Sequence, residues 1–445
     1  MPTHPQRRTR PSDVSAGFLN AWATLVPQWM PQVPRRRGRK PRVPLDQILQ
    51  ALTFHVAEGA GTLAEHFFEL FQAPLADSSW SDRRRRLPWE VFADLMRRAL
   101  RPIATRRQQP EAFWRGWRVL ALDGTQYSVT NTPQVRATMT KAASRRGRAA
   151  FAKLGVAVLL EVGVHNPLAA AIARDGESEL VLGRRLFAQL PKGAVLLADR
   201  LYGVPGIMVD VWAACRRVGS HFLFRVPRHI TARLVTKLPD GSRRVRLNVR
   251  EKGRPWRVDH TVEMREIRVQ VGRQGFRRHE LRLCTSLLDH RTAPALDLAK
   301  LYASRWEHEL FFRNAKRVLR QTDLLQSHTV DTGAQELAAI MLVMALIARE
   351  RARAAHGQVP ALRIKFGVAL AIVRSMWFCL GPIEDLLTAK QKGQVVARGQ
   401  ALLRRSLTGP RRSRTNPRAV RQPIRKWPRL MRTQSVEGPW QLQVV

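Results

Sequence analysis

The sequence is poor in cysteine and has no long hydrophobic run. Its three cysteines, Cys215, Cys284 and Cys379, lie far apart and form no C-x-x-C pair, which excludes a disulfide framework and the common zinc-finger spacings. The longest uninterrupted apolar run extends from Leu337 to Ala348 and is well short of the ~20 residues that span a bilayer. We interpret this run as a buried core helix, and we expect a soluble, cytoplasmic protein with no membrane partner.

Acidic residues are also scarce. The 445 residues include 34 Asp and Glu against 77 Lys and Arg, which gives a formal net charge of +43. A surface with this excess attracts polyanions, so nucleic acid is the first candidate partner. The hydrophobic fraction of 44% is that of a globular chain, so the charge is carried by a folded protein of two or three domains.

Changes in composition and in hydrophobic period divide the chain into segments. The period is helical up to about residue 112, changes to short apolar strands near residue 115, and becomes an alternating β-like pattern after residue 228. The expected segments are a basic N-terminal arm (1–44), a helical DNA-binding region (45–112), the first part of an α/β core (113–228), a β-rich insertion (229–285), the second part of the core (286–355), a helical C-terminal region (356–403), and a basic, flexible tail (404–445).

A run of four arginines, Arg83, Arg84, Arg85 and Arg86, follows the serine-rich stretch 78–82. Serines favour the start of a helix, so this stretch could be the second helix of a helix-turn-helix that lies on DNA. The alternative is the solvated basic end of an ordinary helix. We expect DNA contact from these arginines and leave the helix-turn-helix open.

Two short apolar strands are each expected to end on a carboxylate. Val119–Asp123 and Ala194–Asp199 have this form, and strands are also expected at 154–162, 168–173 and 222–226. A strand holds the residue at its end in a fixed position at the sheet edge, where sites on α/β folds form. Two such carboxylates suit Mg²⁺ or Mn²⁺, although a single Asp at a strand end is more often a cap or a turn residue.

Four polar residues are spaced to share one face of a helix. Tyr302, Arg305, Glu309 and Lys316 are separated by three, four and seven positions, which places them in one stripe of an α-helix. A carboxylate, two cations and a phenol suit a metal-bound phosphodiester. Spacing alone favours a simpler interpretation, an exposed face with Arg–Glu pairing.

Together these motifs resemble a known family. Tyr-x2-Arg-x3-Glu-x6-Lys, preceded by Asp-Gly-Thr at 123–125 and Asp-Arg-x-Tyr-Gly at 199–203, is similar to the signature of DDE transposases of bacterial insertion sequences, in the insertion-sequence-four family. The similarity covers about Trp117 to Arg353. It implies an α/β fold with an RNase H-like core, a mixed five-stranded sheet with helices on both faces, interrupted by the β-rich insertion and flanked by the α-helical N-terminal DNA-binding region and the helical C-terminal region.

The resemblance also implies roles for individual residues. Asp123, Asp199 and Glu309 become the catalytic triad, which binds two Mg²⁺ ions, with Mn²⁺ as a substitute. The residues expected to contact DNA or to support that contact are Tyr302, Arg305, Lys316, Arg200 and Tyr202. Trp256 in the insertion either stacks on a base flipped out near the DNA end or packs on its own sheet. Lys153 and Arg225 are weaker basic candidates.

The implied function is cut-and-paste transposition. Such an enzyme binds the terminal inverted repeats of an insertion sequence, cuts the DNA and transfers the freed 3′-hydroxyl to a target. Its partners are double-stranded DNA and a second copy of the chain in a synaptic homodimer, in the bacterial cytoplasm with the nucleoid. The alternatives are a nuclease of the same fold and a catalytically inactive DNA-binding protein derived from a transposase.

Overall fold

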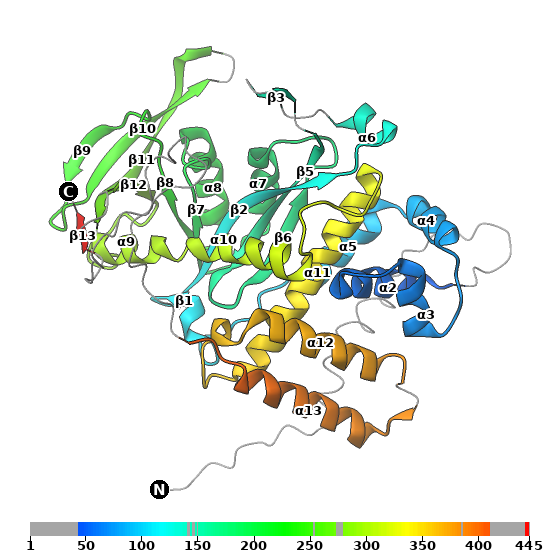
Figure 1. The fold of residues 1–445 in the computed structure, drawn as a ribbon. Helices are drawn as coiled ribbons and strands as arrows, with labels where there is room; N and C mark the ends of the chain where they lie inside the picture. Colours follow the sequence, from blue (N-terminus) through cyan, green and yellow to red (C-terminus); the bar gives the residue numbers. More distant parts are fainter. Residues whose placement is uncertain are drawn as a thin grey trace, which may run out of the picture. The chain divides into compact units, whose positions relative to one another are not determined.

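The computed structural model describes residues 43–139, 143–144, 147–148, 150–251, 254–272, 279–383, 386–409 and 441–444. Nearly all of the expected basic arm (1–44) therefore lies outside the described residues. The chain forms two compact units, shown in Figure 1. The first unit comprises Met1–Gln189 and Trp306–Thr408, and the second comprises Leu190–Arg305 and Gly409–Val445.

The first unit contains an antiparallel sheet in the order β6-β5-β2. Its strands are β2 (Trp117–Val129), β5 (Ala152–Glu161) and β6 (Asn166–Ile172), and the short β1 (Phe113–Trp114) pairs with β2. The strands predicted at 154–162 and 168–173 are confirmed as β5 and β6, which pair antiparallel. The predicted end of the first strand at Asp123 is wrong, because β2 keeps its register with β5 as far as Val129.

The helices of the first unit cover both faces of this sheet. Helix α7 (Glu179–Phe187) lies on one face, where Leu182 approaches Gly155 of β5. Helix α11 (Val330–Ala355) lies on the other face, where Gly333 approaches Leu154 of β5. Strand alternation explains the division, because neighbouring residues of β5 point to opposite faces.

Helix α11 is the central helix of the first unit. It is long and apolar enough to cross a membrane, but 89% of its apolar window is buried inside the protein, so the predicted core helix is confirmed. The helices and short strands not yet introduced in this unit are α2 (Leu45–Glu58), α3 (Leu63–Phe71), α4 (Asp77–Arg86), α5 (Trp89–Ala99), α6 (Pro133–Thr138), α10 (Trp306–Arg313), α12 (Phe366–Leu380), α13 (Ala389–Arg405), β3 (Ala143–Ser144) and β4 (Gly147–Arg148). Of these, α2, α5, α12 and α13 pack directly on α11.

The second unit contains a sheet that is mostly antiparallel. Its strand order is β7 (Ala194–Ala198), β8 (His221–Arg225), β12 (His279–Thr285), β11 (Arg254–Gly272), β10 (Arg243–Glu251) and β9 (Arg233–Lys237), and only β7 and β8 run parallel. Helices α8 (Pro205–Arg217) and α9 (Ala295–Ala303) pack on it. The strands predicted for 229–285 are confirmed, and they pair antiparallel.

The expected flexible tail ends in regular structure. Strand β13 (Gln441–Val444) pairs antiparallel with β11, from Val269↔Val444 to Gly272↔Gln441. The expectation of flexibility is therefore wrong at this end of the tail, because the main chain of the last residues is hydrogen-bonded into a sheet. Both units together have a mixed α/β fold with many helices.

Candidate active site

Asp123 lies in the middle of β2 and is half-exposed. Alternation along the strand places Asp123 on the same face as Tyr127. The ammonium of Lys316 lies over the ring of Tyr127. The cross-strand partner of Asp123 on β5 is Val158. The carboxylate accepts a hydrogen bond from the main chain of Gly124, with 2.9 Å between Oδ1 and N. The strand therefore presents Asp123 from a rigid, paired backbone.

The glycine after Asp123 allows a second carboxylate to approach the strand. Gly124 points to the opposite face, and a Cβ atom added there would overlap the carboxyl group of Glu179 at the start of α7. The Asp-Gly-Thr motif thus has a packing reason for its glycine, because a larger residue would force the side chain of Glu179 to move away from β2.

His308, the neighbour of Glu309 on helix α10, connects this helix to the residue that pairs with Asp123. His308 is buried, and its Nε2 lies 2.9 Å from the carbonyl oxygen of Val158, the cross-strand partner of Asp123. Phe311, one turn further along, is fully buried in the core. These contacts fix α10 against the sheet face that carries Asp123, and Glu309 itself is half-exposed.

Lys316 reaches the same strand from a different kind of helix. Residues 314–319 form a π-helical segment, in which the main-chain N–H of Arg320 donates to Ala315 five residues earlier. The ammonium of Lys316 donates to the carbonyl of Gln126 at 2.6 Å and lies 4.8 Å from the ring centroid of Tyr127. Burial lowers the pKa of this ammonium, and Asp323 partly offsets that effect.

The expectation of one continuous polar stripe is wrong. Helix α9 ends at Ala303, α10 begins at Trp306, and the π segment begins at Asn314. The spacing argument assumed α-geometry from Tyr302 to Lys316, and the turn at 304–305 and the wider π turns both break that geometry. Glu309 and Lys316 still meet β2, but through separate elements.

Asp199 follows strand β7 directly, as the sequence predicts. Its Oδ1 accepts from the main-chain N–H of Leu201 at 2.7 Å, and its carbonyl accepts from that of Tyr202 at 3.3 Å. Tyr202 is fully buried, with its ring edge against Phe224 of β8. Arg200 is exposed between them. The tight turn therefore holds the half-exposed carboxylate at the end of the strand.

The side chain of Tyr302 packs against the end of strand β7 inside the protein. Its side chain is buried, and its hydroxyl donates to the carbonyl of Ala198 at 3.2 Å. Burial raises its pKa to about 12, while Arg305, which hydrogen-bonds the phenol, and Arg225 both oppose that rise. The phenol therefore braces the residue before Asp199, and the DNA contact expected of Tyr302 stays a prediction.

One of the four arginines on α4 is also buried. Arg84 donates to Thr332, Ser327 and Gln335, at 2.9, 3.2 and 3.4 Å. This residue is not the DNA contact that the sequence predicted, because its guanidinium lies inside the first unit. Arg83 is half-exposed and Arg85 and Arg86 are exposed, with Arg85 paired to Asp82 on the same helix.

Two other candidates, Trp256 and Lys153, lie on strands. Trp256 lies in strand β11, and its side chain lies outside the described part of the protein. Lys153 lies on β5, and its ammonium donates to the hydroxyl of Ser128 at 2.6 Å. Lys153 was a weaker candidate for DNA contact in the sequence analysis, because a single lysine in a strand is not a motif.

A preformed metal centre is not visible within the parts of the chain that the structure describes, where no three His, Cys, Asp or Glu side chains gather. The three predicted ligands belong to different units, with Asp123 and Glu309 in the first and Asp199 in the second. Their chemistry nevertheless fits the predicted ion, because half-exposed carboxylate oxygens are the ligands that Mg²⁺ prefers.

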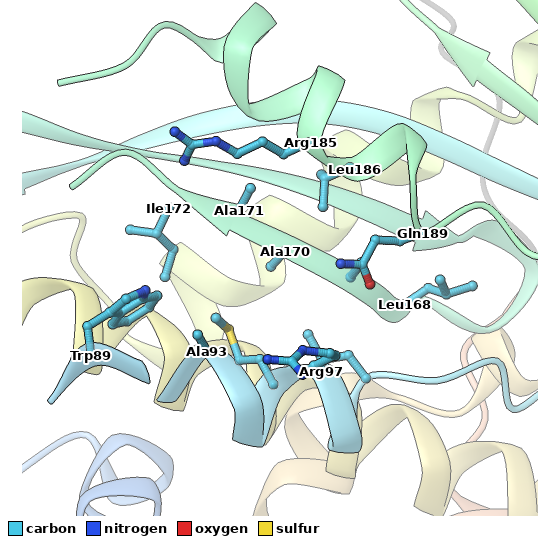
Figure 2. Close-up of a pocket in the computed structure, with 13 residues that line it drawn as sticks. Trp89, Ala93, Arg97, Leu168, Ala170, Ala171, Ile172, Arg185, Leu186 and Gln189 are labelled. Carbon is cyan, nitrogen blue, oxygen red and sulfur yellow. The ribbon is translucent and has the colours of Figure 1, made fainter. Parts of the chain in front are cut away.

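A pocket of about 230 Å³ in the first unit was not predicted (Figure 2). It lies between α5, β6 and α7, with Trp89 and Arg97 on one side, Ala170 on the floor, and Arg185 and Gln189 opposite. The small alanines of β6 leave this space, and no periodic pattern in the sequence signals it. None of the predicted catalytic residues lines the pocket.

Three comparisons relate this chain to known proteins. A family model described as the transposase DDE domain matches residues 114–347. Over 348 residues the chain is 25% identical to transposase InsG for insertion sequence element IS4 of Escherichia coli strain K12, and the match covers 74% of this chain and 75% of InsG. Among solved structures, a chain of the piggyBac transposase synaptic complex with hairpin DNA is similar at 7% identity and a TM-score of 0.45, covering 93% of this chain and 89% of that chain.

Proposed function

This chain belongs to the transposases with a DDE domain, and we propose that it cuts and rejoins DNA at the ends of an insertion sequence. The observation that carries the proposal is the bond from His308 to the carbonyl of Val158, because it fixes Glu309 on the sheet at the level of Asp123. A glutamate on a surface helix without a role at this sheet would not need such a neighbour. Here the neighbour, His308, is buried and bonded to β5, the strand that pairs with β2 at Asp123.

The proposed core is RNase H-like. Its strands are the antiparallel β6, β5 and β2 of the first unit and the parallel β7 and β8 of the second. Its helices are α7, α8, α10 and α11, and the strands β9 to β12 form the insertion that separates Asp199 from Glu309. In this assignment the proposed active carboxylates come from three different places in the fold: strand β2, the turn after β7, and helix α10.

Asp123, Asp199 and Glu309 form the proposed acidic triad. When bound to these carboxylates, two Mg²⁺ ions would supply Lewis acidity at the scissile phosphate and lower the pKa of a water. Lys316 and Arg305 hold phosphate oxygens by charge-assisted hydrogen bonds. Tyr302 is a positioning residue, because its hydroxyl holds the main chain directly before Asp199.

The proposed reaction has two phosphoryl transfers. Attack by water breaks one phosphodiester at the element end and leaves a 3′-hydroxyl and a 5′-phosphate. That 3′-hydroxyl then attacks a phosphodiester of the target DNA, joins the two strands and releases a target 3′-hydroxyl. The same carboxylates serve both steps, and no covalent bond between protein and DNA forms.

Binding of the terminal inverted repeats is assigned to basic surfaces outside the triad. Arg83, Arg85 and Arg86 of α4 present cations with no demand on base sequence. We further propose that two chains assemble on two DNA ends, since both ends must be cut and joined together, and that this takes place in the bacterial cytoplasm.

A supercoiled plasmid with the native element ends tests the proposal. We expect nicking at the ends with Mg²⁺, no nicking with EDTA, and loss of nicking in Asp199→Ala. The matched control is Asp210→Ala, which removes an exposed carboxylate of the same unit on α8 and should retain activity. Nicking without strand transfer would instead indicate a nuclease, and binding without any cutting would indicate an inactive DNA-binding protein.

A further inference from the structure

Lys153 and Lys316 approach the same stretch of β2 from different elements. Lys316 comes from the π segment and donates to the carbonyl of Gln126 at 2.6 Å. Lys153 comes from β5, is the cross-strand partner of Ser128, and donates to its hydroxyl at 2.6 Å. Both side chains are half-exposed. The acceptors of the two ammonium groups, on Gln126 and Ser128, are therefore two residues apart along one strand.

Placing two cations together has an electrostatic cost. Burial lowers the pKa of Lys316, and the positive charges of Lys153 and Arg317 lower it further, while Asp323 acts in the opposite direction. Like charges in a partly desolvated place repel each other unless an anion joins them. The lysine pair is thus arranged for a ligand that carries negative charge and has several acceptor oxygens.

We propose that Lys153 and Lys316 together bind one backbone phosphate of the DNA end. This inference rests on the proposed function and adds Lys153 to the residues that position the substrate. Gln126 is three residues beyond Asp123, so the phosphate lies about 10 Å along the strand from that carboxylate. It is a phosphate flanking the one that is cut, and its capture sets the register of the DNA strand at the site.

The segment after the π helix keeps this subsite in place. Ser128 donates its main-chain N–H to Asp323 at 2.7 Å and accepts from Leu325 at 2.8 Å, so the chain that follows Lys316 is itself paired with the end of β2. Both lysines consequently have rigid supports, and the phosphate finds two donors already oriented. Such preorganisation lowers the entropic cost of binding.

The experiment compares Lys153→Gln with Lys390→Gln, which removes the same charge from an exposed position on α13. Affinity for a duplex carrying the element end is measured as a function of salt concentration. We expect Lys153→Gln to weaken binding about tenfold and to reduce the slope of log K against log salt by about 0.9. Lys390→Gln should change neither, and Lys153→Arg should restore the slope, which excludes a folding defect.

A set of duplexes, each with one neutral methylphosphonate, then locates the contact. At one position next to the cleavage site, the neutral linkage should weaken binding by the unsubstituted chain and have no further effect on Lys153→Gln. Equal salt slopes for Lys153→Gln and the unsubstituted chain would overturn the inference alone, as would equal effects of every neutral linkage on both proteins. Failure of the unsubstituted chain to bind DNA would overturn the proposed function as well.

Discussion

Glu336 on α11 is the acceptor at the centre of a buried polar network, and its replacement by Gln should destabilise the first unit. Its carboxylate accepts from Arg320 at 2.6 Å, from the hydroxyl and the main-chain N–H of Ser327 at 2.6 and 3.0 Å, and from the main chain of Gln326 at 3.2 Å. The side chains of Glu336 and Arg320 are only 3% and 2% exposed. Arg84, buried nearby, is also stabilised in its charged form by Glu336.

The expected loss follows from the charge that is left behind. Breaking a buried ion pair by removing one partner costs about 3–5 kcal/mol, because the remaining charge has no partner and no water. Glu336→Gln should lower the free energy of unfolding of the first unit by that amount. Because the network holds residues 326–327, hydrogen exchange should also rise there before the rest of the unit opens.

Urea unfolding, followed by tryptophan fluorescence, measures the change. Glu69→Gln, which removes an exposed carboxylate on α3, is the matched control and should change stability by less than about 0.5 kcal/mol. Adding Arg320→Met to Glu336→Gln should recover part of the loss, since the unpaired charge is then gone. An unchanged unfolding midpoint for Glu336→Gln would refute the electrostatic reasoning.

Two further predictions concern the turn after Asp199 and a buried histidine. Gly203→Ala should slow end nicking at least about tenfold, because the new Cβ would overlap the carbonyl of Arg225 and displace the turn; Gly206→Ala, where the space is open, should nick normally. Burial lowers the pKa of His55 from 6.5 to about 4, so the neutral form is required in the folded state. The neutral imidazole of His55 therefore contributes about 3 kcal/mol to the free energy of unfolding above pH 6.5, and this contribution is lost as the pH falls from 6.5 towards 4. Urea titrations over that range should show a shallower pH dependence in His55→Asn, and an identical dependence would contradict the assignment.

Local patterns predicted the elements that are specified by neighbouring residues. Strand β7 ends at Ala198 directly before Asp199, and strands β5, β6 and β8 lie within two residues of the ranges expected from the apolar pattern. In each case the signal and the structure share the same few residues. The family resemblance, which the match over 114–347 confirms, depended on such local motifs.

The sequence failed where a distant segment decides the outcome. Strand β2 continues past Asp123 because β5 pairs with it residue by residue, although the polar Gly-Thr-Gln stretch reads as a turn. Arg84 was predicted to be exposed because its neighbours are arginines, yet its hydrogen-bond partners lie 243 to 251 positions further along the chain. The place of Lys153 beside Lys316 likewise depends on cross-strand register, which composition does not encode.

Because Lys316 lies in the π segment and Glu309 lies on α10, the directions of their side chains around the helix axis are set separately. A π turn contains one more residue than the α turn it replaces, so the deletion of Ala315 would bring Lys316 one position closer to Glu309 and change the direction of its side chain around the axis. Glu309 would stay where His308 fixes it, while Lys316 would leave Gln126. The positions of the carboxylate and the cation can thus change independently, and a change of length at this one point would alter the proposed phosphate contact of Lys316 without moving Glu309, the proposed metal ligand.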